Sequence, residues 1–284
     1  MKKKNLIINT FIYIFLIAVL VIVVVPILYT IMSSFKTNSE IMAHPDRLLP
    51  EVFTLENYTT AWGSGSFNIP KMLWNSTYYT ISVVVITVTM SSLMGYVFSR
   101  GGSFPGSKIV FAIFSGLMFI NMGNITIYAV FKVLGIFHLD DSLWGLIVMK
   151  FFGIGIANIY IVRGYIMSLP KSIDEAAEID GCSFMGIFFR IIAPLLKSVI
   201  ATLVVLAFNA SWNDYLMPTL FTITNPGQRP LIVGIMQLKN SGAAASNWNL
   251  MLAGASVALI PVLVVYAFCN RYFVSGIAAG AVKG

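Results

Sequence analysis

The chain has 284 residues, of which 58% are hydrophobic and 10% are charged, and its formal net charge is +7. Folded soluble proteins expose polar groups over much of their surface, so this composition excludes a soluble domain and indicates an integral membrane protein. The basic residues lie at the ends of apolar segments rather than in one patch, which is typical of the flanks of membrane segments and not of a nucleic-acid-binding surface.

Six apolar segments predict six membrane-spanning helices. The first follows a basic N-terminus, Met1–Lys4, and runs over residues 11–32. It is longer than the apolar part of a signal peptide, which is about 7–15 residues, and no small-residue cleavage site follows it. We therefore interpret it as a spanning helix that begins inside the cell. The remaining spans are expected at residues 73–98, 109–127, 143–162, 199–220 and 250–270.

The segments between these spans are too small to form a separate domain. The longest external one covers residues 36–70. The turn Gly101–Lys108 is similar to a phosphate-binding loop, but such a loop needs Lys directly after its second Gly, where this chain has Ser107. We predict a tight cytoplasmic turn there. The fold class is therefore an all-α integral membrane protein with a single transmembrane domain, residues 1–284.

The distribution of Lys and Arg predicts the orientation of the chain. With the N-terminus inside, eleven of these residues lie on the cytoplasmic side and six lie outside, while Lys150 falls within the fourth span. An excess of Lys and Arg in the cytoplasmic loops is the usual pattern in membrane proteins. Both termini are therefore expected in the cytoplasm, together with the loop at residues 163–198 between the fourth and fifth spans.

This loop contains Leu169–Leu196, the interval with the densest cluster of acidic residues in the chain. Ser172 followed three residues later by Glu175 predicts a capping box at the start of a short helix. Gly181 is expected to end that helix, and Pro194 to interrupt the next one. A short polar helix on a membrane protein is a candidate docking surface for a partner.

The spacing of residues within this interval resembles a known motif. Glu175-Ala176-Ala177 is followed by three residues, Gly181, nine residues, Ile191, one residue and Ala193-Pro194. This resembles the EAA motif of bacterial binding-protein-dependent ABC permeases, with Ala193 in place of the usual Leu. The segment ASWNDY, residues 210–215, and the C-terminal RYFVSGIAAGAVKG are similar to the shorter, six-span subunit of the maltose-type sugar permeases.

The resemblance implies a permease subunit of an importer in the bacterial plasma membrane, without enzymatic activity, metal or cofactor of its own. ATP and Mg²⁺ would be bound by two cytoplasmic ATPase subunits. The other implied partners are a second permease subunit in a heterodimer, an extracytoplasmic solute-binding protein and membrane lipid. The cargo would be a carbohydrate, in particular an oligosaccharide. The residues implied in coupling to the ATPase are Asp174, Glu175, Ala176, Ala177, Asp180, Gly181 and Pro194.

Polar residues inside the spans are candidates for the transport path, because such groups are costly unless they face a cavity or another helix. Lys150 could line a cavity, pair with the second permease chain or extend to the interface. The Asn residues could equally form hydrogen bonds between helices. Trp212 could stack on a sugar ring or anchor the span at the membrane boundary. These candidates are Asn121, Asn124, Lys150, Asn209, Trp212, Asn213 and Asp214.

Other classes of membrane protein remain as alternatives. An ion-coupled carrier usually needs a carboxylate within the membrane, and Asp214 is the only acid near a span. A membrane enzyme lacks suitable residues, because His44 and His138 are far apart and Cys182 and Cys269 have no metal-ligand spacing. An ABC importer for a solute other than a sugar also stays open. Neither of the first two classes requires an acidic cytoplasmic helix.

Overall fold

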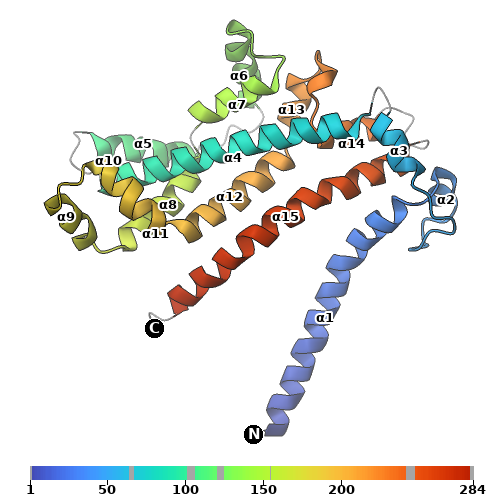
Figure 1. The fold of residues 1–284 in the computed structure, drawn as a ribbon, viewed down its shortest axis with the longest axis horizontal. Helices are drawn as coiled ribbons and strands as arrows, with labels where there is room; N and C mark the ends of the chain where they lie inside the picture. The colour runs from blue at the N-terminus through green and yellow to red at the C-terminus, as the bar shows by residue number, and fades with distance from the viewer. Residues whose placement is uncertain are drawn as a thin grey trace. The chain divides into compact units, whose positions relative to one another are not determined.

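The computed structural model describes residues 2–63, 67–100, 106–119, 125–153, 155–240 and 247–281. Within these ranges every regular element is a helix (Figure 1). The chain divides into two compact units, one formed by Met1–Leu73 and Leu231–Ile260, the other by Trp74–Pro230 and Pro261–Gly284. The predicted all-helical fold is therefore confirmed.

The first unit contains α1 (Lys2–Ser33), α2 (Asn38–Ala43), α3 (Glu56–Gly63), α14 (Leu231–Asn240) and the first part of α15 (Trp248–Ala281). Its core joins α3 and the start of α4 (Ile69–Arg100) to α14 and α15. Apolar side chains from these elements pack against one another in this core. The buried members of this core are Ala61, Phe67, Ile69, Met72, Leu231, Ile235, Met251 and Val257.

A buried asparagine fixes the segment that follows α1. The Nδ2 atom of Asn57 donates hydrogen bonds to the backbone oxygens of Ser34 (2.7 Å) and Lys36 (2.8 Å). Its Oδ1 atom accepts a hydrogen bond from Nδ2 of Asn249 at 2.7 Å. Lys36 is itself fully buried, and its Nζ donates to the backbone oxygen of Arg47. One side chain thus connects α1, α3 and α15.

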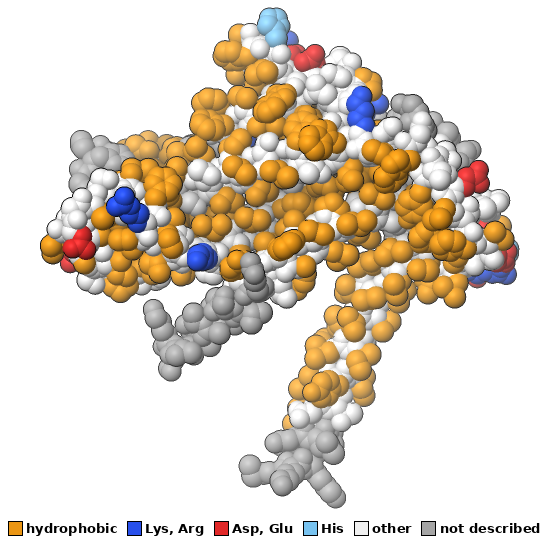
Figure 2. Space-filling view, viewed as in Figure 1, with side chains coloured by type: hydrophobic (Ala, Val, Ile, Leu, Met, Phe, Trp, Pro, Cys, Tyr) orange, Lys and Arg blue, Asp and Glu red, His pale blue; other side chains and the backbone are white. Residues whose placement is uncertain are grey.

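Helix α1 packs very little against the rest of the chain. Its apolar part, Ile8–Ser33, is long enough to cross a membrane, yet none of its most apolar stretch is buried within the chain. Figure 2 shows hydrophobic side chains over the visible face of this helix. A helix that is apolar and exposed on all sides is stable only against lipid or another protein. This property fits the first predicted span.

The second unit contains the remainder of α4 and several shorter helices, arranged around two cores. One core is formed by residues of α6, α7, α13 and the first half of α4, including Tyr79, Leu134, Leu143, Leu146 and Phe221. The other surrounds Tyr96 at the opposite end of α4. The shorter helices are α5 (Ser107–Phe119), α6 (Ile125–Ile136), α7 (Leu143–Phe152), α8 (Ile156–Ser168), α12 (Lys197–Trp212) and α13 (Leu216–Phe221).

Three predicted spans correspond to long continuous helices, and two do not. Spans 11–32, 73–98 and 250–270 lie within α1, α4 and α15. The expected helix at 143–162 is instead the pair α7 and α8, bent by 44°, because Gly153 and Gly155 interrupt it. The expected helix at 199–220 ends at Trp212, and α13 begins after a polar stretch, Asn213–Tyr215.

The third predicted span, residues 109–127, overlaps α5 and the start of α6, and residues 120–124 between them lie outside the described residues. By length and composition, the described helices supply three membrane spans, or up to five if each bent pair counts as one.

Candidate functional site

The acidic interval folds into four short helices before α12. These are α9 (Ser172–Ile179), α10 (Phe184–Ile187), the π-helix η1 (Phe188–Ile192) and α11 (Ala193–Leu195). The chain then bends by 80° into α12, just after Pro194. The expected break at Gly181 and the second helix after it are confirmed, whereas Pro194 does not interrupt that helix, which continues to Leu195.

Glycine ends α9 for a specific reason. Gly181 has φ +80°, a left-handed conformation that costs an L-residue with a side chain about 1–2 kcal/mol. Its N–H donates to the oxygen of Glu178 (3.0 Å), and the N–H of Cys182 donates to that of Ala177 (2.9 Å). This is the Schellman arrangement, which satisfies the last carbonyls of a helix. The position therefore requires glycine.

The predicted capping box at the start of α9 is wrong. Ser172 is the first residue of the helix itself, and the preceding Lys171 already has helical dihedrals and makes no side-chain cap. The oxygen of Lys171 accepts hydrogen bonds from the N–H groups of Asp174 and Glu175, so the backbone closes the first turn without a serine cap. The side-chain cap lies one helix later, where Ser183 accepts from the N–H of Gly186.

The inner face of α9 is anchored to α4. The Nε atom of Arg100 lies 2.9 Å from Oδ2 of Asp174, and both side chains are almost completely buried. The Nη2 atom of Arg100 also donates to the backbone oxygen of Leu169 at 2.9 Å. Ala177, one turn after Asp174, is buried in the core around Tyr96. Ala177, which the resemblance implies in coupling, therefore faces its own chain and is not available to a partner.

The outer face of α9 is open. Glu175, Ala176 and Asp180 are exposed, as predicted for a docking surface, and so is Glu178. Ile179 is 87% exposed, which is unusual for so large an apolar side chain in a short acidic helix. Sequence reasoning missed Ile179, although its place among acidic neighbours was the available signal. Figure 2 shows acidic side chains at the end of the molecule that carries α9.

A second cluster lies at the end of α12. Nδ2 of Asn213 donates to the oxygen and to Oδ1 of Asn209, at 3.0 and 2.8 Å. Trp212 is only 6% exposed and stacks on Phe208, with ring centroids 5.4 Å apart. The structure therefore brings together three of the predicted path residues, and it buries the tryptophan rather than presenting it to solvent.

Asp214 extends this cluster toward α4. Its Oδ2 atom accepts a hydrogen bond from the hydroxyl of Tyr79 at 3.3 Å, and it interacts electrostatically with Lys150 of α7. Tyr79 was not predicted as a site residue, because an apolar span gives no sign that one tyrosine has a polar partner. The remaining predicted path residues, Asn121 and Asn124, lie outside the described residues.

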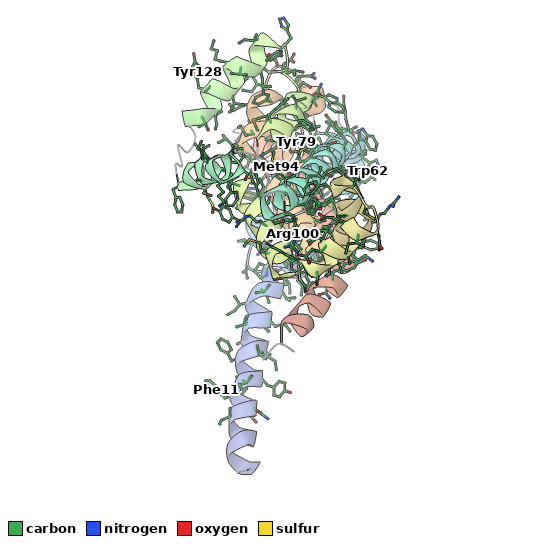
Figure 3. All side chains as sticks on the ribbon, turned by 90° about the vertical axis from the view of Figure 1, so that its left-hand side faces the viewer. Phe11, Trp62, Tyr79, Met94, Arg100 and Tyr128 are labelled. Atoms are coloured by element: carbon green, nitrogen blue, oxygen red, sulfur yellow. The ribbon has the colours of Figure 1, made fainter. Side chains whose placement is uncertain are left out.

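The two clusters contact α4 at positions that lie far apart along this helix. Tyr79 and Arg100 both belong to α4, and a helix rises 1.5 Å per residue, so their Cα atoms are separated by about 32 Å. The hydrocarbon core of a bilayer is about 30 Å thick. Figure 3, drawn from the end of the molecule that carries α9, labels both residues. Among the described residues there is no group of three or more His, Cys, Asp or Glu side chains that could hold a metal ion.

Replacing Gly181 with alanine should loosen the end of α9. The left-handed φ costs alanine about 1–2 kcal/mol, so the amides of residues 177–182 should exchange with deuterium more quickly in the purified protein. Gly164→Ala in α8 is the matched control, because a Cβ there meets nothing within 4 Å and the φ is not left-handed. Equal exchange of α9 in both variants would show that the Gly181 backbone is not under this constraint.

Comparisons with known proteins place this fold in a family. Residues 102–278, more than half of the chain, match the model of the binding-protein-dependent transport system inner membrane component. A probable ABC transporter permease protein, YurM of Bacillus subtilis, is 31% identical over 100% of this chain and 91% of its own. A probable permease protein for starch degradation products, AmyC of Thermoanaerobacterium thermosulfurigenes, is 35% identical over 91% of each chain.

A solved structure has the same fold. It is a bacterial ABC transporter involved in the import of the acidic polysaccharide alginate, and one of its chains is 23% identical, with a TM-score of 0.80. The match covers 95% of the present chain and 98% of the other. With the family match over more than half of the chain and a relative 31% identical over all of it, the chain belongs to the binding-protein-dependent inner membrane components, the permease subunits of ABC transporters in the bacterial plasma membrane.

Proposed function

We propose that the chain is the shorter permease subunit of an importer that moves an oligosaccharide inward, driven by ATP hydrolysis in a separate ATPase docked on α9. The observation that carries this proposal is the division of α9 into two faces. One face is held by the buried ion pair between Arg100 and Asp174, and the other exposes acidic side chains and Ile179.

The exposed face has the chemistry of a docking surface. Burial of a large aliphatic side chain contributes about 2 kcal/mol, so Ile179 favours association with an apolar pocket. Glu175 and Asp180 would select a partner with basic groups and exclude acidic ones. Among the predicted coupling residues, Asp174, Ala177 and Gly181 support the helix from within, and Pro194 marks the bend into α12.

The proposed topology has six spans in one transmembrane domain, residues 1–284. The spans would be α1, α4, the segment of α5 and the start of α6, the pair α7 and α8, α12, and α15. The excess of Lys and Arg on the α9 side supports cytoplasmic termini and a cytoplasmic coupling loop at residues 163–198. The separation of about 32 Å between Tyr79 and Arg100 supports opposite sides of the membrane for the two clusters.

The proposed cargo is supported by relatives named for sugar-polymer transport, starch degradation products in one case and alginate in the other. The path or partner-interface residues would be those of the second cluster, Asn209, Trp212, Asn213, Asp214 and Lys150, together with Asn121 and Asn124. The amide groups of Asn209 and Asn213 can form hydrogen bonds with sugar hydroxyls, whereas Trp212, which is buried against Phe208, would support the cluster from within.

The proposed assembly contains a second permease subunit, two ATPase subunits that bind ATP and Mg²⁺, and an extracytoplasmic solute-binding protein. The exposed apolar surface of α1 supports contact with lipid or with the second permease. Family membership disfavours the ion-coupled carrier, whereas an ABC importer for a solute other than a sugar differs only in its cargo.

Hydrolysis of ATP by the purified complex should identify the cargo. We expect its solute-binding protein to stimulate hydrolysis when loaded with one class of glycan, tested with neutral malto-oligosaccharides and acidic alginate oligosaccharides. Glycerol phosphate esters and polyols form the non-sugar arm of the assay. Unloaded binding protein is the control. Stimulation by a non-sugar compound alone, or by none of these compounds, would contradict the oligosaccharide proposal.

A further inference from the structure

Arg100 occupies a special position, because its single side chain connects three segments. It is the last residue of α4, and its guanidinium contacts Asp174 in α9 and the backbone oxygen of Leu169, which ends α8. Both contacts are 2.9 Å long. A planar guanidinium can bind two acceptors in a fixed direction, which the single ammonium of lysine cannot do. The guanidinium forms one hydrogen bond, to Leu169, and one buried ion pair without hydrogen-bond geometry, to Asp174, and together these contacts oppose separation of α9 from α4.

Tyr96, one turn before Arg100, fastens the far side of the same loop. Its hydroxyl donates to the backbone oxygen of Phe184, the first residue of α10, at 3.0 Å. Its ring packs against the rings of Phe184 and Phe188, with centroids 4.5 and 5.1 Å apart. The loop that carries α9 is thus attached to α4 both before α9, at Leu169, and after it, at Phe184.

The other end of α4 is attached in a similar way. Nδ2 of Asn75 donates to the backbone oxygens of Gly227 and Arg229, each at 3.0 Å, and Tyr79 donates to Asp214. All these residues belong to the second unit. A continuous 32-residue helix therefore has polar attachments near both ends, one set to the α9 loop and one to the cluster that follows α12. Its interior hydrogen bonds make it stiff along its axis.

We propose that Arg100 is a positioning residue that makes α9 and α4 move as one rigid body, so that displacement of α9 by the ATPase reaches the Tyr79–Asp214 cluster. This inference rests on the proposed docking of the ATPase on α9. It assigns to Asp174 a role distinct from that of Glu175. Asp174 holds α9 to α4 from within, whereas Glu175 faces the partner.

The ion pair between Arg100 and Asp174 can hold α9 to α4 because it is buried. An exposed pair contributes little and is replaced readily by water. A buried pair that loses one member leaves an uncompensated charge, so the helices must separate to admit water. Neither oxygen of the Asp174 carboxylate has a hydrogen-bond partner within the described chain, and neither does Nε of Arg100, so the attraction of the Arg100 charge at 2.9 Å is the principal compensation for this buried carboxylate. Loss of Arg100 should release α9 while α4 keeps its other contacts.

The test measures the distance between α9 and α4 in the intact complex. Spin labels are placed on cysteines introduced at Ser172 and Val85, both at exposed positions, in a chain with Cys182 and Cys269 changed to Ser. Distances are measured without nucleotide and with ATP and vanadate. We expect the parent chain to give the same single distance in both states. Arg100→Lys and Asp174→Asn should each give a shifted or second distance in the trapped state.

Two further variants test whether the effect is specific to the pair of Arg100 and Asp174 or follows from any weakening of the contacts to α4. Arg163→Lys removes a hydrogen bond from Nε of Arg163 to the oxygen of Phe98, which joins α8 to α4 without α9, and it should behave like the parent. The exchange of charges in Arg100→Asp/Asp174→Arg should restore part of the single distance. A distance that shifts in the parent, or that stays single in Arg100→Lys and Asp174→Asn, would overturn the proposal.

Retention of the ATPase during purification separates this inference from the docking proposal. If the parent complex retains the ATPase and Arg100→Lys does not, Arg100 supports docking itself and the transmission role is overturned. If the labelled and the unlabelled parent chains both fail to retain it, docking on α9 is wrong, and the present inference falls with it. Retention in every variant, with the distance shift confined to Arg100→Lys and Asp174→Asn, is the result we expect.

Discussion

Replacing Glu175 with lysine should release the ATPase from the permease. The change places a positive charge on the exposed face of α9, where the proposed partner groove is basic. Like charges brought together at an interface cost several kcal/mol, and each 1.4 kcal/mol is about tenfold in affinity, so binding should weaken by about a hundredfold or more. The measurement is the amount of ATPase that co-purifies with the tagged permease from solubilised membranes.

Glu56→Lys is the control for the Glu175 variant. Glu56 is an exposed acid at the start of α3, so the net charge changes equally without altering α9. Both variants should insert into the membrane in normal amounts, because neither residue is part of a core. Co-purification of the ATPase with Glu175→Lys at the level seen for Glu56→Lys would contradict docking on this face.

Asn57→Ala should have the largest effect on stability. The alanine leaves the backbone oxygens of Ser34 and Lys36 without this donor and Nδ2 of Asn249 without this acceptor, in a buried site. A buried polar group left unpaired costs about 1–3 kcal/mol, so we expect a loss of about 3 kcal/mol or more. The free energy of unfolding in detergent micelles, followed by tryptophan fluorescence during denaturant titration, measures it.

Thr59→Ala provides the comparison for Asn57→Ala. It lies in the same helix and is exposed, and its hydroxyl bonds only to the nearby oxygen of Glu56. Its effect should stay within about 0.5 kcal/mol, as is usual for surface substitutions. If the two variants unfold at the same denaturant concentration, Asn57 does not stabilise the connection between α1, α3 and α15.

Local features of the candidate site were predictable from the sequence. The break at Gly181 follows from backbone sterics at one residue, and the acidic helix before it follows from composition over one turn. The spacing from Glu175 to Pro194 also lies within a single interval. These signals need no knowledge of residues elsewhere in the chain, which is why the acidic helix and its end at Gly181 were predicted correctly.

Long-range pairings were not predictable in this way. Nothing near Asp174 indicates that its partner is Arg100, at the end of a span far away in the sequence. Without that pairing, Asp174 and Ala177 were named together with Glu175 as coupling residues, although the structure buries the first two and exposes Glu175. The hydrogen bond from Tyr79 to Asp214 is a further example.

The division of long apolar segments into separate helices was also not predictable from the sequence. Residues 143–162 are mostly apolar apart from Lys150 and Asn158, so hydropathy alone predicts one span, and the closely spaced Gly153 and Gly155 are the signal for the break. The end of α12 at Trp212 was not predicted either, and here the misleading signal was polar rather than apolar. The polar residues that stop the helix were interpreted as groups lining a path inside it, because polarity alone does not distinguish these two roles.

The π-helix at Phe188–Ile192 has a consequence for the length of the loop. A π-turn contains one more residue than the α-turn it replaces, and here the N–H of Ala193 bonds to the oxygen of Phe188. Deleting one residue from this segment would restore an α-turn and rotate everything before it by about 100° relative to α12. The direction in which Glu175 and Ile179 point is therefore set by chain length as well as by side-chain chemistry, and natural insertions or deletions should be rare in this segment.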